Sequence, residues 1–272
     1  MTNTASPDVY PPPHHVLRDL AFDVQPGRTI NRAWMPVHEY VCNARGRVRT
    51  GLVATVVDAI CGGLAVVSAS PGWIATADLT VHVTAPIVGD EVAAFARVRR
   101  SGRTTVVLES EIFVDGRNDD PVAIATATFT VLQRRDNNPI LDTEIDGEVP
   151  RRPFVEHSAR FDRDAYNACG FERIAHDTVQ VSPSPYIMNS LGGVQGGILA
   201  SLIDDATINV LGDEFETVDL HLVYLALAKQ GPIRASAIIN DLHDDFGSVN
   251  VTVEDIGAGR VTTRATAVGV RW

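Results

Sequence analysis

The sequence predicts an α+β protein made of two copies of one module, each a long helix wrapped by an antiparallel sheet, paired as a pseudo-dimer within one chain. The first observation is a repeat: GILASLIDDA, which begins at Gly197, superposes without a gap on GLVATVVDAI, which begins at Gly51. The same offset of 146 residues carries Asp204 onto Asp58. Two later matches keep the order, residues 217–220 with 76–79 and residues 265–267 with 125–127. An internal repeat indicates a duplicated structural unit.

Each half reads as a strand, a helix and four strands. In the first half we expect a strand near residues 29–37, a turn containing Asn43 and Gly46, a helix over 51–68, and strands over 74–84, 92–99, 104–114 and 122–133. The second half repeats the plan with a helix over 197–212 and strands over 218–225, 233–240, 248–254 and 261–271. Strands joined by such short turns are expected to be antiparallel neighbours.

The first helix is apolar nearly all round, which is typical of a helix buried on every side. A sheet must therefore wrap it. Its segment from 51 to 70 is also long and apolar enough to span a bilayer. Asp58 within the segment, and the more polar copy over 197–212, favour a core helix instead.

Composition shifts divide the chain into a flexible tail over residues 1–16, an N-terminal module over 17–133, a linker over 134–153 and a C-terminal module over 154–272. The tail is polar and rich in proline and histidine, unlike a signal peptide. The linker is rich in Asp, Asn, Arg and Pro. Its 20 residues reach roughly 65 Å when extended, enough to cross one module and begin the next.

Charge and cysteine usage exclude several classes of protein. The formal net charge of −11 argues against binding to nucleic acid or to an anionic membrane. Three cysteines without a C-x-x-C pair indicate neither a disulfide framework nor a cysteine zinc site, so we expect a cytoplasmic protein without a bound metal. The sequence also lacks a G-x-S-x-G elbow, a P-loop and a dinucleotide glycine pattern.

Both helices carry a carboxylate on an otherwise apolar surface. Thr55 and Asp58 share one helix face, and Ser201 and Asp204 share it in the second copy. Burying an ionised carboxylate without partners costs several kcal/mol or raises its pKa. The structural alternative is an Asp hydrogen-bonded to backbone at the interface between the modules.

The second helix begins at Gly196 and Gly197, where unpaired backbone N–H groups meet the positive end of the helix dipole. Glycine lets a ligand approach that backbone closely. The alternative is that the two glycines only form a tight entry turn.

The spacing of these residues resembles a known family. Asn189 lies seven positions before Gly196, and Asp204 lies eight after it. This resembles the PaaI-like hotdog-fold acyl-CoA thioesterases, whose motif runs Asn, then His-Gly-Gly at the helix start, then an acid in the helix. The second half has Gln195 in place of the His, and the first half, with Asn43 and Asp58, reads Arg49-Thr50-Gly51 at the triplet.

The resemblance implies a tandem hotdog fold with two composite sites, and hydrolysis of an acyl-CoA thioester. A family Ser or Thr eighteen residues after the acid matches Thr76, and Thr217 is its counterpart after a shorter connection. By the resemblance, the first site would join Asn189 and Gly196 to Asp58 and Thr76. The second site would join Asn43 and Thr50 to Asp204 and Thr217.

Thioester hydrolysis needs a donor for the developing oxyanion, and the Gly196 amide is suited to that role. Asp58 would activate water or attack the carbonyl itself, with Thr76 positioning the water or the carboxylate. No cofactor is expected, since coenzyme A is part of the substrate. We favour the first site because it retains the glycine pair.

Substrate binding is assigned to Gln195 and Gly197 at the helix entry, and to Arg99, Arg103 and Arg49 as candidates for the coenzyme A phosphates. The alternative for these arginines is a solvated turn.

Two rival functions are weighed. The first is a non-catalytic acyl-CoA binding or regulatory module with a decayed site. The second is a hydratase, which needs a His; neither helix contains one, and His82 and His221 are read as ordinary strand residues. Further homo-oligomerisation of the paired unit is compatible with the sequence.

Overall fold

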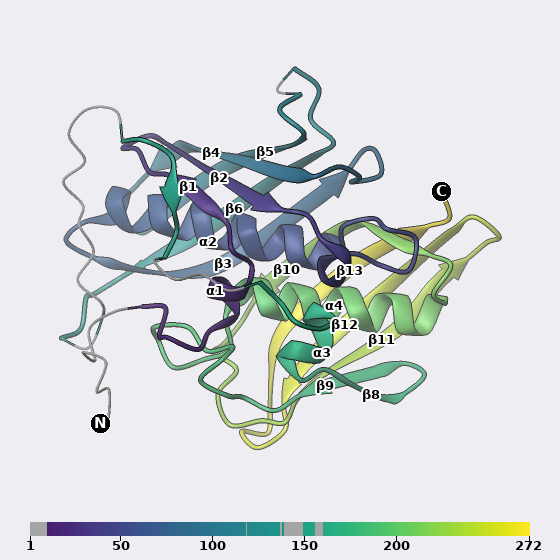
Figure 1. Ribbon diagram of the computed structural model, residues 1–272. Coiled ribbons are helices and arrows are strands. Elements are labelled where there is room, and N and C mark those ends of the chain that lie inside the picture. The colour runs from purple at the N-terminus through teal and green to yellow at the C-terminus, as the bar shows by residue number, and fades with distance from the viewer. Residues whose placement is uncertain (1–9, 118, 137, 139–148, 156–159) are drawn as a thin grey trace, which may run out of the picture.

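The structure is a computed structural model that describes residues 10–117, 119–136, 138, 149–155 and 160–272. Two long helices, α2 (Thr50–Ala69) and α4 (Gly196–Leu211), lie against one face of a single antiparallel sheet of thirteen strands (Figure 1). The strand order is β7-β1-β2-β4-β5-β6-β3-β10-β13-β12-β11-β9-β8. On one side of the β3–β10 junction lie the six strands of the N-terminal copy, with β7 from the end of the predicted linker at the edge. The predicted fold of two helix-and-sheet copies within one chain is confirmed.

The strands of the first half are β1 (Asp23–Gln25), β2 (Ile30–Pro36), β3 (Trp73–Val83), β4 (Glu91–Ser101), β5 (Thr105–Val114) and β6 (Ala123–Leu132), and β7 (Arg152–Pro153) lies at the end of the predicted linker. Those of the second half are β8 (Glu172–Ala175), β9 (Thr178–Val181), β10 (Glu216–Tyr224), β11 (Ile233–Leu242), β12 (Phe246–Asp255) and β13 (Arg260–Val270). Short helices α1 (Val16–Asp19), η1 (Glu39–Val41) and α3 (Ala165–Cys169) complete the described elements.

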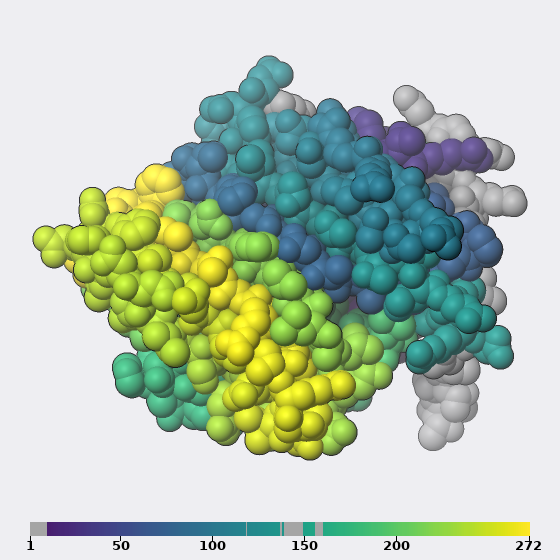
Figure 2. All heavy atoms as spheres, turned by 180° about the vertical axis from the view of Figure 1, so that it is seen from behind, coloured from purple at the N-terminus to yellow at the C-terminus, as the bar shows by residue number. Residues whose placement is uncertain are grey.

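The two halves join through β3 and β10, which pair antiparallel with Val81 opposite Leu220. Both histidines read as ordinary strand residues lie at this seam. The His82 ring contacts the Asp219 carboxylate at 2.7 Å, and the His221 ring contacts that of Asp78 at 2.9 Å. Seen from behind, the two halves form one continuous outer face, blue and teal meeting green and yellow (Figure 2).

The helices of the two copies meet at their N-terminal halves, where small residues allow close approach. A Cβ on Gly51 would lie 2.5 Å from the Ser201 Cα, and one on Gly197 would overlap the backbone of Thr55. The Thr55 and Ser201 hydroxyls hydrogen-bond to each other at 3.1 Å. Because these two residues are equivalent in the repeat, this contact lies on the internal pseudo-symmetry axis.

Helix α2 is a core helix. Most of its residues are buried, including Leu52, Val57 and Leu64, because it packs against α4 and the strands of its own half. By length and composition it is apolar enough to cross a membrane, but two thirds of its most apolar window is buried inside the fold. The three cysteines are buried and unpaired. The cytoplasmic location stays a prediction.

The prediction that strands joined by short turns are neighbours is wrong at two places. β3 pairs with β6 and β10 rather than with β4, and β10 pairs with β13 and β3 rather than with β11. The segment over residues 84–90 therefore carries the chain from the seam to the far side of its half. This crossing leaves β3 free to join β10, which is what makes the two halves one sheet.

The prediction of a flexible tail over residues 1–16 is wrong for residues 10–16. The Val16 side chain is fully buried, and the His15 ring lies 2.9 Å from the carbonyl oxygen of Met188. Residues 1–9 lie outside the described residues. Most of the predicted linker over 134–153 also lies outside them, but its end forms β7, which pairs with β1.

Candidate active site

Asp58 on α2 is a buried carboxylate with three hydrogen-bond donors. Its Oδ1 accepts from the Thr76 hydroxyl at 2.8 Å. Its Oδ2 accepts from the Gln195 side-chain amide at 2.9 Å and from the Gly197 backbone N–H at 3.1 Å. Thr76 belongs to the first half, whereas Gln195 and Gly197 belong to the second. The carboxylate therefore lies in a composite site between the copies.

Local structure explains how these partners reach Asp58. The β3–β6 pairing has a register shift between Thr76 and Asp78, which locally increases strand twist and re-aims side chains. Gln195 is the N-cap of α4, and its Oε1 accepts the Ile198 N–H at 3.1 Å. Since the carbonyl oxygen of the Gln195 amide caps the helix, its NH₂ group points to Asp58.

Burial governs the ionisation of Asp58. Desolvation raises the pKa of its carboxyl group to about 6, and the hydrogen bonds from Thr76 and Gly197 hold it below a still higher value. A carboxylate with this pKa is a stronger base than an exposed Asp. It is nevertheless ionised at neutral pH, so it can accept a proton there.

Gly196 of the second copy faces the Asp58 carboxylate of the first copy. A Cβ at this position would lie 3.1 Å from the Asp58 Oδ2, so only glycine fits here without displacing the acid. The Tyr224 hydroxyl of β10 donates to the Gly196 carbonyl oxygen at 2.8 Å and fixes the entry turn. As the first residue of α4, Gly196 has no helical acceptor for its N–H, and no acceptor for it is found among the described residues.

Asn189 lines the same region, but its side chain holds its own loop. Its Oδ1 accepts from the backbone N–H groups of Leu191 and Gly193 at 2.9 and 3.1 Å. In the first copy, Asn43 accepts in the same way from Arg45 and Arg47, at 2.9 and 3.2 Å. The two asparagines thus shape equivalent turns before the two long helices.

A cavity of about 440 Å³ opens beside Asp58. Asp58, Thr76, Gln195 and Gly196 line it together with Asn189. Its other walls are mainly apolar and come from α2, β3, β6, the segment around α1 and the loops of the second half, with Gly62, Gly63, Val66, Trp73, Phe129, Leu132, Phe154, Leu191, Leu199, Tyr224 and Leu227 among them. Such a cavity suits a ligand with an apolar part and one polar reacting centre.

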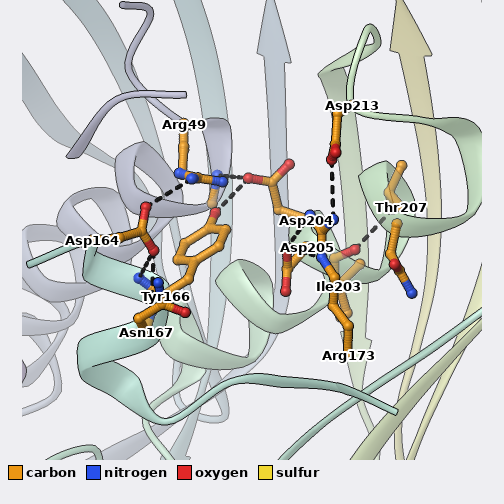
Figure 3. Close-up of polar contacts among 12 residues, drawn as sticks. Arg49, Asp164, Tyr166, Asn167, Arg173, Ile203, Asp204, Asp205, Thr207 and Asp213 are labelled. Carbon is orange, nitrogen blue, oxygen red and sulfur yellow. Dashed lines mark hydrogen bonds and ion pairs between the residues drawn. The ribbon is translucent and has the colours of Figure 1, made fainter. Parts of the chain in front are cut away.

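The equivalent carboxylate, Asp204, has different partners. Its Oδ2 accepts from the Gly51 backbone N–H at 3.0 Å and from the Tyr166 hydroxyl at 2.5 Å (Figure 3). Arg49 stands where the first site has Gln195, but its guanidinium lies over the Tyr166 ring and pairs with Asp164 at 2.8 Å. Tyr166 therefore supplies to Asp204 the side-chain hydrogen bond that Gln195 supplies to Asp58.

Other predicted members of the second site do not assemble as expected. The Thr217 hydroxyl is buried without a hydrogen-bond partner, whereas its counterpart Thr76 donates to Asp58. The Thr50 hydroxyl instead donates to the Thr217 carbonyl oxygen at 2.5 Å. Asn43, Thr50, Asp204 and Thr217 still line one cavity, which has a volume of about 260 Å³.

Two substitutions between the copies account for part of this difference. Gly62 and Ala59, which line the Asp58 cavity, correspond to Ile208 and Asp205 in the second copy. Ile208 projects into the smaller cavity. Asp205 pairs with Arg173 at 2.8 Å (Figure 3). The space open beside Asp58 is thus filled by a branched side chain and an ion pair beside Asp204.

The basic residues proposed for coenzyme A are not at the Asp58 cavity. Arg99 pairs with Glu109 at 2.6 Å on the exposed surface of β4 and β5, and Arg103 does not line the cavity. Arg49 lines the second-copy cavity. The charge of the hairpin was misleading here, because Glu109 neutralises Arg99 on the exposed surface of the sheet.

Sequence reasoning also missed two tyrosines, Tyr166 and Tyr224. It missed Arg134 and Arg135 as well, and these two arginines line a separate cavity that adjoins the one beside Asp58. Tyr166 lies 38 residues from Asp204 in a short helix, so no helical spacing marks it. Within the part of the chain that the structure describes, no group of three or more His, Cys, Asp or Glu side chains could hold a metal ion.

Comparison with known proteins supports the fold. The chain resembles the tesB protein of Mycobacterium avium subs paratuberculosis, with 13% identity, a TM-score of 0.61, and 94% of this chain and 97% of the other covered. It also resembles a protein of unknown function with a hot dog fold from Alicyclobacillus acidocaldarius, with 14% identity, a TM-score of 0.60, and 95% of this chain and 98% of the other covered. A third similar structure is an acyl-ACP thioesterase from Bacteroides thetaiotaomicron, with 12% identity, a TM-score of 0.58, and 88% of this chain and 97% of the other covered.

These similarities establish that the chain has the hotdog fold in tandem. No protein-family model matches the sequence, and no curated protein matches it either. The PaaI-like assignment within the fold stays a prediction.

Proposed function

We propose that the chain hydrolyses acyl-CoA thioesters, and that it does so at one of its two composite sites. The observation that carries the proposal is Asp58, a buried carboxylate that lines a large apolar cavity next to the unpaired N–H of Gly196. Five of the structures with the same fold are named as thioesterases or putative thioesterases, which is consistent with this chemistry.

Gly196 would receive the carbonyl oxygen of the thioester. Its N–H stands at the N-terminus of α4, where the helix dipole favours negative charge. Charge develops on this oxygen as the tetrahedral intermediate forms, and a preorganised donor typically contributes about a hundredfold to a thousandfold in rate.

Asp58 would act as the general base. Its Oδ2 accepts two hydrogen bonds and its Oδ1 accepts one, so Oδ1 keeps a lone pair for a water molecule. The carboxylate takes a proton as the water oxygen bonds to the carbonyl carbon, and the C–S bond then breaks. The proton passes from Asp58 to the departing thiolate, which restores the carboxylate. In the alternative route, the same lone pair of Oδ1 would attack the carbonyl carbon directly, and water would then hydrolyse the acyl-enzyme.

The second composite site is proposed to be structural. The Tyr166 hydroxyl donates to Asp204, and Ile208 lines the adjoining cavity, which is smaller than that beside Asp58. Thr217 does not contact the carboxylate that Thr76 contacts in the first copy. Asp204 instead accepts from Tyr166, and Arg49 pairs with Asp164, so these charged side chains are held by protein groups as in a packed interface.

A panel of acyl-CoA thioesters with detection of the free thiol tests the proposal. We expect catalytic thiol release from at least one acyl chain length. Binding of acyl-CoA without thiol release would instead identify a non-catalytic binding module and contradict the proposal.

A further inference from the structure

We infer that a basic cavity beside the Asp58 cavity binds the phosphate groups of the substrate's carrier, either coenzyme A or the phosphopantetheine of a carrier protein. The inference rests on the proposed function, because it assigns a place to the carrier of the thioester. Phosphate binding can nevertheless be measured without any hydrolysis.

The two cavities are contiguous. The basic cavity has a volume of about 420 Å³ and shares four lining residues with the Asp58 cavity, namely Trp73, Leu132, Leu191 and Leu227. Trp73 lies three residues before Thr76 on β3, which corresponds to about 10 Å along the strand. A flexible pantetheine arm can span that separation between a phosphate group and a thioester at Asp58.

Two arginines at the start of the predicted linker line the basic cavity. The Arg134 guanidinium lies over the Trp73 ring, 5.3 Å from its centre, and donates to the Asn138 carbonyl oxygen at 3.2 Å. Arg135 is exposed, and its backbone N–H donates to the Asn138 side chain at 2.8 Å. Asn138 is itself 5% exposed, so it fixes the turn that presents both arginines.

Two cations of the second half hydrogen-bond to the backbone of residues that line the basic cavity. The Lys229 ammonium donates to the Leu191 carbonyl oxygen at 3.0 Å. The Arg260 guanidinium donates to the Leu227 carbonyl oxygen at 2.9 Å. Both carbonyls belong to residues that line the two cavities. Two arginines of the predicted linker thus line the cavity, and two cations of the second half contact residues of the same lining.

The charged side chains in the cavity lining favour an anionic ligand. No Asp or Glu lines it among the described residues, although the chain carries a formal net charge of −11. Asp136 follows Arg135 in the turn but is not part of the lining. Arginine forks bind phosphate oxygens bidentately, and lysine binds them as a point charge. Anionic phosphate is therefore the ligand chemistry that this cavity fits.

Calorimetric binding of coenzyme A and of a holo carrier protein tests the inference, with pantetheine as the phosphate-free probe. We expect Arg135→Glu and Lys229→Glu each to weaken binding of the phosphate-bearing carrier that the chain recognises by about tenfold, and Arg135→Gln to weaken it less. The weakening should diminish as ionic strength rises. Whichever of the two carriers shows this loss is the physiological class.

Arg264→Glu, a charge reversal on the exposed face of β13, is the matched control and should not change the affinity. The inference is overturned if neither phosphate-bearing probe binds, if the charge reversals leave binding unchanged, or if Arg99→Glu weakens binding while Arg135→Glu does not. Carrier binding that depends on Arg135 in a chain without thiol release would contradict only the proposed function. Hydrolysis with binding insensitive to Arg135 would contradict only this inference.

Discussion

Replacing Asp58 by Asn should remove activity while making the fold more stable at neutral pH. The asparagine carbonyl oxygen can accept the hydrogen bonds from Gln195 and Gly197, and its NH₂ group can donate to Thr76. The substitution therefore preserves the contacts but removes a buried charge. Burial raises the pKa of Asp58 from 3.8 to about 6, which makes its ionisation cost about 3 kcal/mol of folding free energy.

The direction in which stability changes with pH follows from proton binding by Asp58. Between the unfolded pKa and about pH 6 the folded chain holds a proton that the unfolded chain has lost, so the stability due to this group is present at low pH and is lost as pH rises through about 6. Between about pH 5 and about pH 7.5, the wild type should lose roughly 1.4 kcal/mol relative to Asp58→Asn. Urea unfolding of both proteins at the two pH values measures this difference.

The same ionisation controls catalysis. Since the general base must be deprotonated, kcat/KM of the wild type should rise with pH and level off above about 6. A stability difference between wild type and Asp58→Asn that does not change with pH, or that grows in favour of the wild type, would refute the buried-carboxylate reasoning.

Three further substitutions probe the parts of the site. Thr76→Val removes a donor to Asp58 and should lower kcat about tenfold to a hundredfold with a small change in melting temperature. An unchanged kcat would show that Thr76 does not position the carboxylate. Gly62→Ile introduces the second copy's residue into the cavity and should raise KM or lower kcat for thioesters without unfolding the helix, so unimpaired turnover would place the substrate elsewhere. Tyr166→Phe leaves Asp204 without one donor and should reduce the free energy of unfolding by about 1–3 kcal/mol while kcat is retained. A loss of kcat at full stability would show that the second site takes part in catalysis.

The repeat in the sequence predicts most of the fold and half of the site. An offset of 146 residues places Asp58 and Asp204 at equivalent positions, and the resemblance pairs each acid with the opposite helix start, as the structure does for Asp58 with Gly197 and for Asp204 with Gly51. The order of β3 and β4 could not be predicted from turn length, because the short connection crosses the sheet.

The inequality of the two sites depends on residues outside the repeated pattern. Tyr166 reaches Asp204 from a short helix, and at the same offset the first half has Leu20, which cannot donate a hydrogen bond. Ile208 in place of Gly62 is visible in the alignment of the copies, but its consequence depends on which face of the helix the cavity occupies. Side-chain packing between distant segments decides both effects, and local sequence patterns do not encode it.

The most direct test of a single working site compares thiol release by Asp58→Asn and Asp204→Asn on the acyl-CoA that the wild type hydrolyses best. Both substitutions remove one buried negative charge at equivalent positions of the repeat. We expect Asp58→Asn to lower kcat at least a thousandfold and Asp204→Asn to retain kcat within about threefold at temperatures where both remain folded. Equal losses in the two variants, or a loss confined to Asp204→Asn, would contradict the account.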